Sequence, residues 1–326
     1  MTKRKPIPSL ELVAPVLTGK VAAIARLLTR AEIGDEEASE ALAEIYRHTG
    51  QAAIVGVTGV AGSGKSTLIQ RLVAAIRNGS RTVAVVAVDP TSPFSGGAIL
   101  GDRVRMHSFA NDPGVFIRSM ATRGALGGLA RTTLEAVDVL DAAGFDIVLI
   151  ETVGVGQDEI DVLRSAHTIV VVSAPGLGDD VQAIKAGILE IADIHAVSKC
   201  DRTDSSKTLT DLKNMLTMNM SCQQRSGWSS PVVATSALDG QGTVELLDHI
   251  DNHLAFLKSS GEITARRQRI AEWRLLQSAE DLLHSEFVKH RDGRLSSFTQ
   301  QLMSRETSPR IAAKQLVDNI FRENRS

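Results

Sequence analysis

The sequence is poor in cysteine and has no long hydrophobic run. Its 326 residues include two cysteines, Cys200 and Cys222, which are far from any Cys-x-x-Cys spacing. This argues against a disulfide framework or a cysteine-based zinc site and fits a reducing compartment. No apolar run reaches the roughly 18 residues that span a bilayer. Residues 1–17 begin basic but lack the apolar core and cleavage site of a signal peptide. We therefore expect a soluble, cytoplasmic protein.

An excess of charge of one sign is also absent. The 36 Lys and Arg residues nearly balance the 38 Asp and Glu residues, so the formal net charge is −2. This balance indicates that neither nucleic acid nor an anionic membrane is the main partner. The chain is long enough for one large domain or about two ordinary ones, and 43% of its residues are hydrophobic, so it can bury a sizeable core.

The spacing of the apolar residues changes along the chain. Residues 19–48 repeat them every three or four positions, which predicts two helices. Short β-branched runs then alternate with helical stretches, as in buried parallel strands joined by helices. These runs cover residues 52–58, 82–88, 145–151, 168–174, 193–198 and 231–236. After residue 258 the chain becomes a charged helical tail, which either packs on the main domain or forms a dimerisation arm.

Residues 59–66, GVAGSGKS, match the complete phosphate-binding motif G-x-x-x-x-G-K-[ST]. They lie between a predicted strand and a predicted helix, as this motif requires. The glycines allow backbone N–H groups to approach phosphate oxygens, and the helix N-terminus adds a favourable dipole. Lys65 would bind the β- and γ-phosphates, and Ser66 would bind Mg²⁺. The phosphate-binding residues predicted here are Gly59, Ala61, Gly62, Ser63, Gly64, Lys65, Ser66 and Thr67.

The motif and the strand pattern together predict an α/β fold of the P-loop NTPase type. We expect a mainly parallel central sheet flanked by helices, with helical extensions at both ends. The predicted division is an N-terminal helical extension (1–50), a P-loop domain (51–258) and a C-terminal helical arm (259–326).

Three carboxylates follow in loops or at strand ends, where a parallel sheet collects its ligands. Asp89 and Glu151 end predicted strands, and Asp102 lies in a glycine-rich loop. Glu151 follows the apolar run IVLI, as in a Walker-B motif, where a carboxylate holds Mg²⁺ through water or orients the attacking water. The alternative is that each acid caps a helix or a turn. We assign Ser66, Asp89, Asp102 and Glu151 to the metal, and Lys65 and Glu151 to catalysis.

The sequence VSKCD, residues 197–201, follows the fifth predicted strand. GTPases carry Asn-Lys-x-Asp at this point, where the carboxylate accepts two hydrogen bonds from guanine that adenine cannot donate. Lys199 and Asp201 are in place, but Ser198 replaces the Asn. After the sixth predicted strand, Ser236 and Ala237 match the turn beneath the base. The motif therefore predicts a guanine nucleotide, with Ser198 as the departure.

The whole pattern resembles the MeaB/ArgK family of methylmalonyl-CoA mutase-associated GTPases. Five runs carry the resemblance: GVTGVAGSGKSTLI, AVDPTSPFSGGAILGDRVRM, FIRSMATRGALGGLARTT, IETVGVGQDE and APGLGDDVQAIKAGI. It covers residues 19–257. The resemblance implies a homodimeric GTPase that uses GTP, GDP and Mg²⁺. As a chaperone of an adenosylcobalamin-dependent acyl-CoA mutase, it would gate cofactor loading and protect the mutase.

The resemblance also implies roles for single residues. It supports the metal and hydrolysis set given above, and it makes Asp179, Gln182 and Lys185 a third switch that signals to the mutase. Without it, that loop reads as an ordinary strand-to-helix connection capped by an aspartate. The sequence lacks an Asp-x-His-x-x-Gly motif, so no direct cobalamin ligand is expected.

Several alternatives remain open at this point. Arg118, Arg123 or Arg131 could stabilise charge during phosphoryl transfer, although a surface role is commoner for arginine. A kinase of a small molecule or of a binding protein would need an acceptor pocket, for which no separate domain is evident. A nickel metallochaperone GTPase would need well-spaced cysteine or histidine ligands, and the cysteines and histidines of this sequence are poorly spaced for that purpose.

Overall fold

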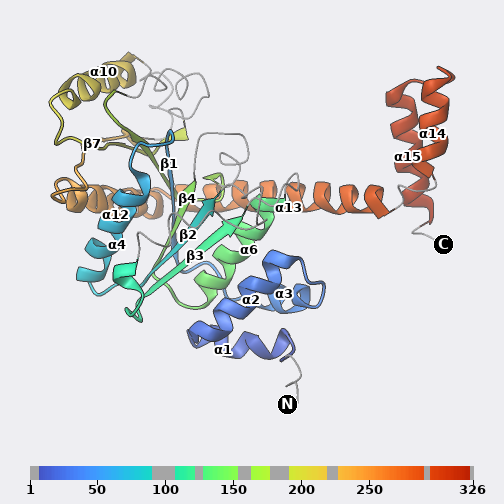
Figure 1. The fold of residues 1–326 in the computed structure, drawn as a ribbon, viewed down its shortest axis with the longest axis horizontal. Coiled ribbons are helices and arrows are strands. Elements are labelled where there is room, and N and C mark those ends of the chain that lie inside the picture. Colours follow the sequence, from blue (N-terminus) through green and yellow to red (C-terminus); the bar gives the residue numbers. More distant parts are fainter. Residues whose placement is uncertain are drawn as a thin grey trace. The chain divides into compact units, whose positions relative to one another are not determined.

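The computed structural model describes residues 7–89, 107–121, 128–152, 163–176, 191–218, 227–289 and 294–323. The chain divides into two compact units, Met1–Ile270 and Ala271–Ser326. Figure 1 shows the elements of both. The two units are described separately below.

The first unit is built on a seven-stranded sheet in which every neighbouring pair of strands is parallel. The order across the sheet is β3-β2-β4-β1-β5-β6-β7. The strands are β1 (Ala53–Thr58), β2 (Val83–Asp89), β3 (Val115–Ala121), β4 (Ile147–Thr152), β5 (Thr168–Ser173), β6 (Ile194–Val197) and β7 (Val232–Ala234). This confirms the predicted α/β fold, because continuous apolar runs suit strands that are covered on both faces.

The edge strand β3 is the strand of this sheet that the sequence analysis did not predict. Its sequence VFIRSMA contains Arg118 and Ser119, which interrupt the apolar run used to recognise the other strands. The strand forms because it pairs with β2 along its full length, from Val83 opposite Val115 to Asp89 opposite Ala121.

Helices α4 (Lys65–Asn78) and α12 (Thr243–Ser259) cover one face of the sheet. Apolar side chains of α4 recur every three or four positions, so one face of this helix is buried. Its buried side chains Leu68, Ile69, Leu72, Val73 and Ile76 join β-branched residues of the strands in one core. The beginning of α4 is thereby fixed at the carboxyl end of β1.

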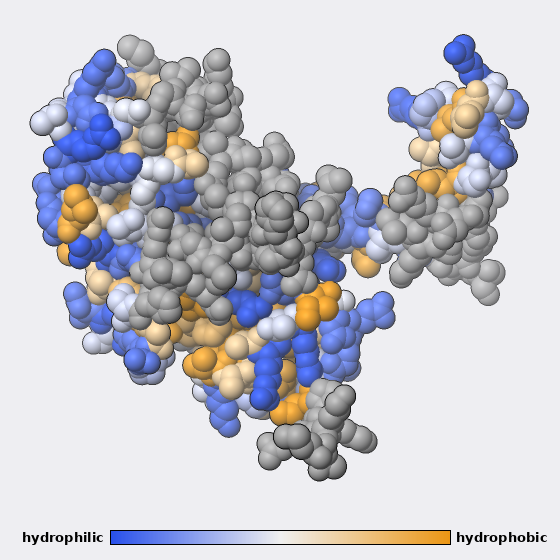
Figure 2. All heavy atoms as spheres, viewed as in Figure 1, coloured by the Kyte–Doolittle hydropathy of each residue, from blue (hydrophilic) through white to orange (hydrophobic). Residues whose placement is uncertain are grey.

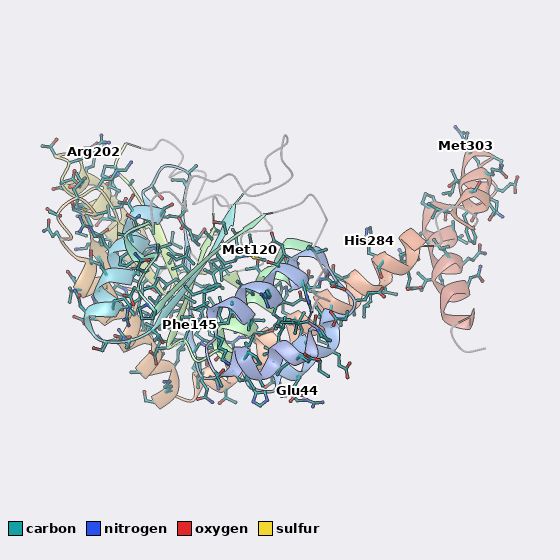
Figure 3. The ribbon with its side chains drawn as sticks, turned by 60° about the horizontal axis from the view of Figure 1, so that its bottom comes forward. Glu44, Met120, Phe145, Arg202, His284 and Met303 are labelled. Atoms are coloured by element: carbon teal, nitrogen blue, oxygen red, sulfur yellow. The ribbon has the colours of Figure 1, made fainter. Side chains whose placement is uncertain are left out.

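The opposite face carries α6 (Gly128–Ala142), which contacts β2, β3 and β4, and α10 (Ser205–Met218), which contacts β6 and β7. Phe116 of β3 and Phe145 lie with ring centroids 6.2 Å apart on this side of the molecule. Figure 3 labels Phe145 together with Met120, which is fully buried.

The N-terminal helices pack on the outside of α6. They are η1 (Leu10–Leu12), α1 (Val13–Leu17), α2 (Val21–Ile33) and α3 (Ala38–Tyr46). Ile24, Leu27 and Leu28 of α2 are completely buried. The two helices predicted from residues 19–48 correspond to α2 and α3, and α2 ends at Gly34, whose φ is +75°.

The second unit contains the greater part of α13 (Glu262–Lys289), with α14 (Arg294–Met303) and α15 (Pro309–Glu323). Helices α14 and α15 contact each other. Large apolar side chains remain exposed here, including Leu275, Leu282 and Met303. Figure 2 shows hydrophobic residues of α14 and α15 among hydrophilic ones. In the part of the chain that the structure describes, no helix combines the length and apolar character needed to cross a membrane.

Candidate nucleotide-binding site

The phosphate-binding loop joins β1 to α4 at the carboxyl edge of the sheet. Gly62 and Gly64 have φ angles of +79° and +90°, which side chains disfavour. Gly59 packs so closely against β5 that a Cβ atom there would lie 2.0 Å from the Val172 carbonyl oxygen. These positions require glycine, as the motif predicted. The loop is therefore held tightly against the end of β5.

Lys65 begins α4 and folds back over the loop. Its side chain is buried, and Nζ donates hydrogen bonds to the carbonyl oxygens of Gly59 at 2.7 Å and Val60 at 3.0 Å. The ammonium group thus lies inside the loop, where the phosphates of a nucleotide would bind.

Ser66 and Glu151 meet at the same edge. Ser66 Oγ donates to Glu151 Oε1 at 2.6 Å, and Glu151 is 3% exposed. Glu151 lies near the end of β4, beside β1, and the next residue, Thr152, donates to Thr58 Oγ1 at 2.8 Å. The fold therefore brings together a helix residue and a strand residue that are 85 positions apart in sequence.

The other predicted metal ligands are only partly described. Asp89 is the last residue of β2, the strand that pairs with β4 from Val83 opposite Ile147 to Val88 opposite Thr152. Its backbone lies at the same edge as Glu151, and its side chain lies outside the description. Asp102 and the predicted switch residues Asp179, Gln182 and Lys185 also lie outside the described residues.

The predicted base-binding loop follows β6. Asp201 is exposed, and its Oδ1 accepts a hydrogen bond from Ser236 Oγ at 3.1 Å. Lys199 has a φ of +56°, and its Nζ donates to the Gly62 carbonyl oxygen at 2.8 Å. The structure therefore brings the two predicted base-binding segments together and joins them to the phosphate-binding loop.

Arg71 of α4 supports the second base-binding segment, and the sequence analysis did not identify it. Its guanidinium donates to the carbonyl oxygens of Ala237 and Leu238, each at 2.7 Å. The one signal in the sequence is its position, two turns into the helix that follows the phosphate-binding motif.

Two of the three candidate arginines make contacts away from the phosphate-binding loop. Arg118 is paired with Glu32 of α2 and bonded to Thr29 Oγ1, so it ties the N-terminal helices to β3. Arg131 lies 3.9 Å from Glu135 on the same helix. Arg123 is outside the described residues.

Comparisons with known proteins point to one family. The model of the family described as methylmalonyl Co-A mutase-associated GTPase MeaB matches residues 24–292. A protein of Pyrococcus abyssi that is named as a GTPase is 43% identical over 312 residues, 95% of this chain and 96% of the relative. The GTPase ArgK of Escherichia coli is 35% identical over 287 residues, 86% of each chain. The crystal structure of a LAO/AO transport system kinase is similar, with a TM-score of 0.68 and 25% identity over 98% of this chain and 99% of that one.

Proposed function

The chain belongs to the MeaB family of methylmalonyl Co-A mutase-associated GTPases, and we propose that it regulates an adenosylcobalamin-dependent acyl-CoA mutase. In this role it hydrolyses GTP to control loading of the mutase cofactor and to protect the mutase. One observation carries the nucleotide chemistry. The Ser66–Glu151 pair and the Asp201–Ser236 pair lie at one edge of one sheet. The bond from Lys199 to Gly62 links the base-binding loop to the phosphate-binding loop between them.

At the phosphate end, the backbone of residues 59–66 binds the phosphates. When a nucleotide binds, Lys65 gives up its hydrogen bonds to the Gly59 and Val60 carbonyl oxygens and donates to the β- and γ-phosphate oxygens instead. Its charge opposes the negative charge of the phosphoryl group as the bond to the leaving diphosphate breaks. Glu151, near the end of β4, orients the attacking water.

The oxygen ligands in this region fit Mg²⁺. Ser66 Oγ and Glu151 Oε1 are hard donors at 2.6 Å from each other, and the end of β2 brings Asp89 to the same edge. We assign the metal to Ser66, Asp89, Asp102 and Glu151. The ion supplies positive charge that neutralises the phosphates.

At the base end, Asp201 accepts hydrogen bonds from the guanine edge. Ser236 donates to the same carboxylate and so fixes its orientation, and Arg71 holds the following turn. Adenine offers no matching pair of donors, so an adenine nucleotide would leave the carboxylate without a matching partner.

The family description supports the partner, and the exposed apolar residues of the second unit support a homodimer. In this proposal Asp179, Gln182 and Lys185 form the switch that signals to the mutase, residues 259–326 form the dimerisation arm, and the protein is cytoplasmic.

The first experiment measures binding of fluorescent GDP, with ADP as competitor, in the presence of Mg²⁺. We expect GDP to bind at least on the order of 100-fold more tightly, and Asp201→Asn to remove most of that preference. Asp204→Asn is the matched control, because Asp204 is exposed and paired with Arg202. GTP hydrolysis is then measured with and without an acyl-CoA mutase. Equal rates would contradict the regulatory role.

A kinase is the second candidate, because the chain is similar along its whole length to a protein named as a transport system kinase. Transfer of ³²P from labelled GTP to a small molecule or a binding protein, in place of release as phosphate, would support this candidate.

A further inference from the structure

Ser198 stands at the start of the base-binding loop, but its contacts belong to the phosphate-binding loop. The side chain is 3% exposed. Its Oγ donates to the carbonyl oxygen of Ser63 and lies 3.1 Å from the carbonyl oxygen of Ser173. A hydroxyl group has a single proton to donate. Both carbonyl groups compete for this proton, so Ser198 has no further donor for a nucleotide base.

The direction of the first contact matters for phosphate binding. In a trans peptide group, the carbonyl and the N–H point in opposite directions. When Ser198 holds the Ser63 carbonyl, the N–H of Gly64 in the same peptide group points away from Ser198. This N–H belongs to the segment whose backbone cradles the phosphates. Fixing the carbonyl therefore fixes the direction of a phosphate-binding donor.

The neighbouring residue makes a parallel contact. Lys199 Nζ donates to the carbonyl oxygen of Gly62, the residue before Ser63. Two successive residues of the base-binding loop thus hold two successive carbonyl groups of the phosphate-binding loop. The two loops are in direct contact here, since a Cβ atom on Gly64 would lie 3.8 Å from Ser198 Oγ.

We propose that Ser198 is a positioning residue that fixes the phosphate-binding loop and leaves recognition of the base to Asp201. This inference rests on the proposed guanine-nucleotide site and adds a division of work within it. Phosphate binding depends on residue 198 whatever the base is, and base preference does not. The departure from the usual Asn removes an amide from the base site without separating the two loops.

The test compares Ser198→Ala, Ser198→Cys and Ser198→Thr in the full-length protein, with GDP and ADP as ligands in the presence of Mg²⁺. Ser198→Ala should weaken the binding of GDP and of ADP by the same factor, roughly tenfold, because one buried carbonyl loses its donor. The ratio of the two dissociation constants should not change. Cys, a weak donor of similar size, should give an intermediate loss, and Thr should restore affinity. Asp201→Asn should instead change the ratio of the two dissociation constants, because it should weaken the binding of GDP and leave that of ADP unchanged.

Melting temperatures of the nucleotide-free variants separate positioning from general stability. A merely structural role would lower the melting temperature of Ser198→Ala and leave both dissociation constants unchanged, which would overturn the proposal. A changed GDP to ADP ratio in Ser198→Ala or Ser198→Cys would also overturn it, because Ser198 would then contribute to base recognition. Failure of the unaltered protein to prefer GDP would instead contradict the proposed function.

Discussion

The two edges of the parallel sheet differ in the charged side chains that hold their backbone groups, since carboxylates that accept from backbone N–H groups gather at the amino edge. At the carboxyl edge, side-chain donors hold loop carbonyl groups: Lys65 binds those of Gly59 and Val60, and Lys199 binds that of Gly62. Arg71 likewise binds the carbonyl groups of Ala237 and Leu238, in the turn predicted to lie beneath the base. Each of these three donors is a cation.

At the amino edge, carboxylates hold backbone N–H groups. Asp141 accepts hydrogen bonds from the N–H groups of residues 50, 51 and 52, at 2.6, 3.0 and 2.8 Å. Asp146 accepts from the N–H of Thr82 at 2.7 Å. Asp193 accepts from the N–H of Ile169 at 2.8 Å and from both terminal nitrogens of Arg266.

This difference shows how one sheet separates chemistry from stability. Where cations hold the carbonyl groups, the N–H groups of the same peptides are directed elsewhere and positive charge lies beside the loop, as an anion requires. Where carboxylates hold the N–H groups, the entries to the strands are already paired with protein groups. We therefore expect substitutions at the carboxyl edge to alter nucleotide chemistry, and those at the amino edge to alter folding.

Lys65→Ala should give the largest effect at the carboxyl edge. Removal of the ammonium group takes away charge that stabilises the transferring phosphoryl group, so kcat for GTP hydrolysis should fall on the order of 100- to 1,000-fold. Steady-state phosphate release measures it. Lys258→Ala, on the exposed last turn of α12, is the control and should retain full activity. Similar rates for the two variants would contradict the assignment of Lys65.

The sequence predicted the carboxyl edge well where the relevant residues are contiguous. The segment of residues 59–66 carries its own conformational requirements, since its glycines and Lys65 act within one loop. The strands were predicted from their apolar runs, except β3, in which Arg118 serves a contact with α2 that only the folded chain reveals. A local pattern cannot anticipate a partner from a different element.

The parts of the site that escaped prediction depend on distant pairs. Arg71 and Ala237 are 166 positions apart, and Ser198 and Ser63 are 135 apart. The sequence showed that Ser198 departs from the usual Asn, but not which groups its hydroxyl would hold. Such contacts follow from the order of strands in the sheet, which brings β1, β5 and β6 side by side.

Acid should destabilise the protein through its buried histidines. Burial lowers the pKa of His167, just before β5, and of His195, within β6, from 6.5 to about 4. Between these values the unfolded chain binds protons that the folded chain does not. The free energy of unfolding should therefore fall as the pH drops from 6.5 to 4, by up to about 3 kcal/mol for each histidine. Chemical denaturation at several pH values measures this slope.

His195→Val isolates the contribution of one buried histidine. Neither ring nitrogen of His195 has a hydrogen-bond partner among the described residues, and a β-branched residue suits the strand. The variant should lose the share of the pH dependence between 6.5 and 4 that comes from His195 and should be more stable than the unaltered protein at pH 5. An unchanged slope would show that His195 does not take part.

Asp141→Asn should destabilise the fold without changing nucleotide binding. The carboxylate is buried and accepts three backbone hydrogen bonds ahead of β1. An amide retains one acceptor oxygen and adds donors that face other donors, so we expect a loss of about 3 kcal/mol in the free energy of unfolding. The dissociation constant of GDP, measured well below the melting temperature, should stay the same. A weakened GDP affinity would remove the distinction between the two edges.

The smallest effect should separate two arginines on one helix. Arg266 of α13 forms two 3.0 Å contacts with the carboxylate of Asp193 and also bonds the carbonyl oxygen of His167, with a side chain that is 20% exposed. Arg269, three positions later and 60% exposed, pairs with Glu262. Arg266→Ala should lower the free energy of unfolding by about 1–2 kcal/mol, because it leaves a mostly buried carboxylate, 12% exposed, short of donors, and Arg269→Ala by less than about 0.5 kcal/mol. Equal losses would mean that the amino-edge network around Asp193 contributes no more to the free energy of unfolding than a surface ion pair does.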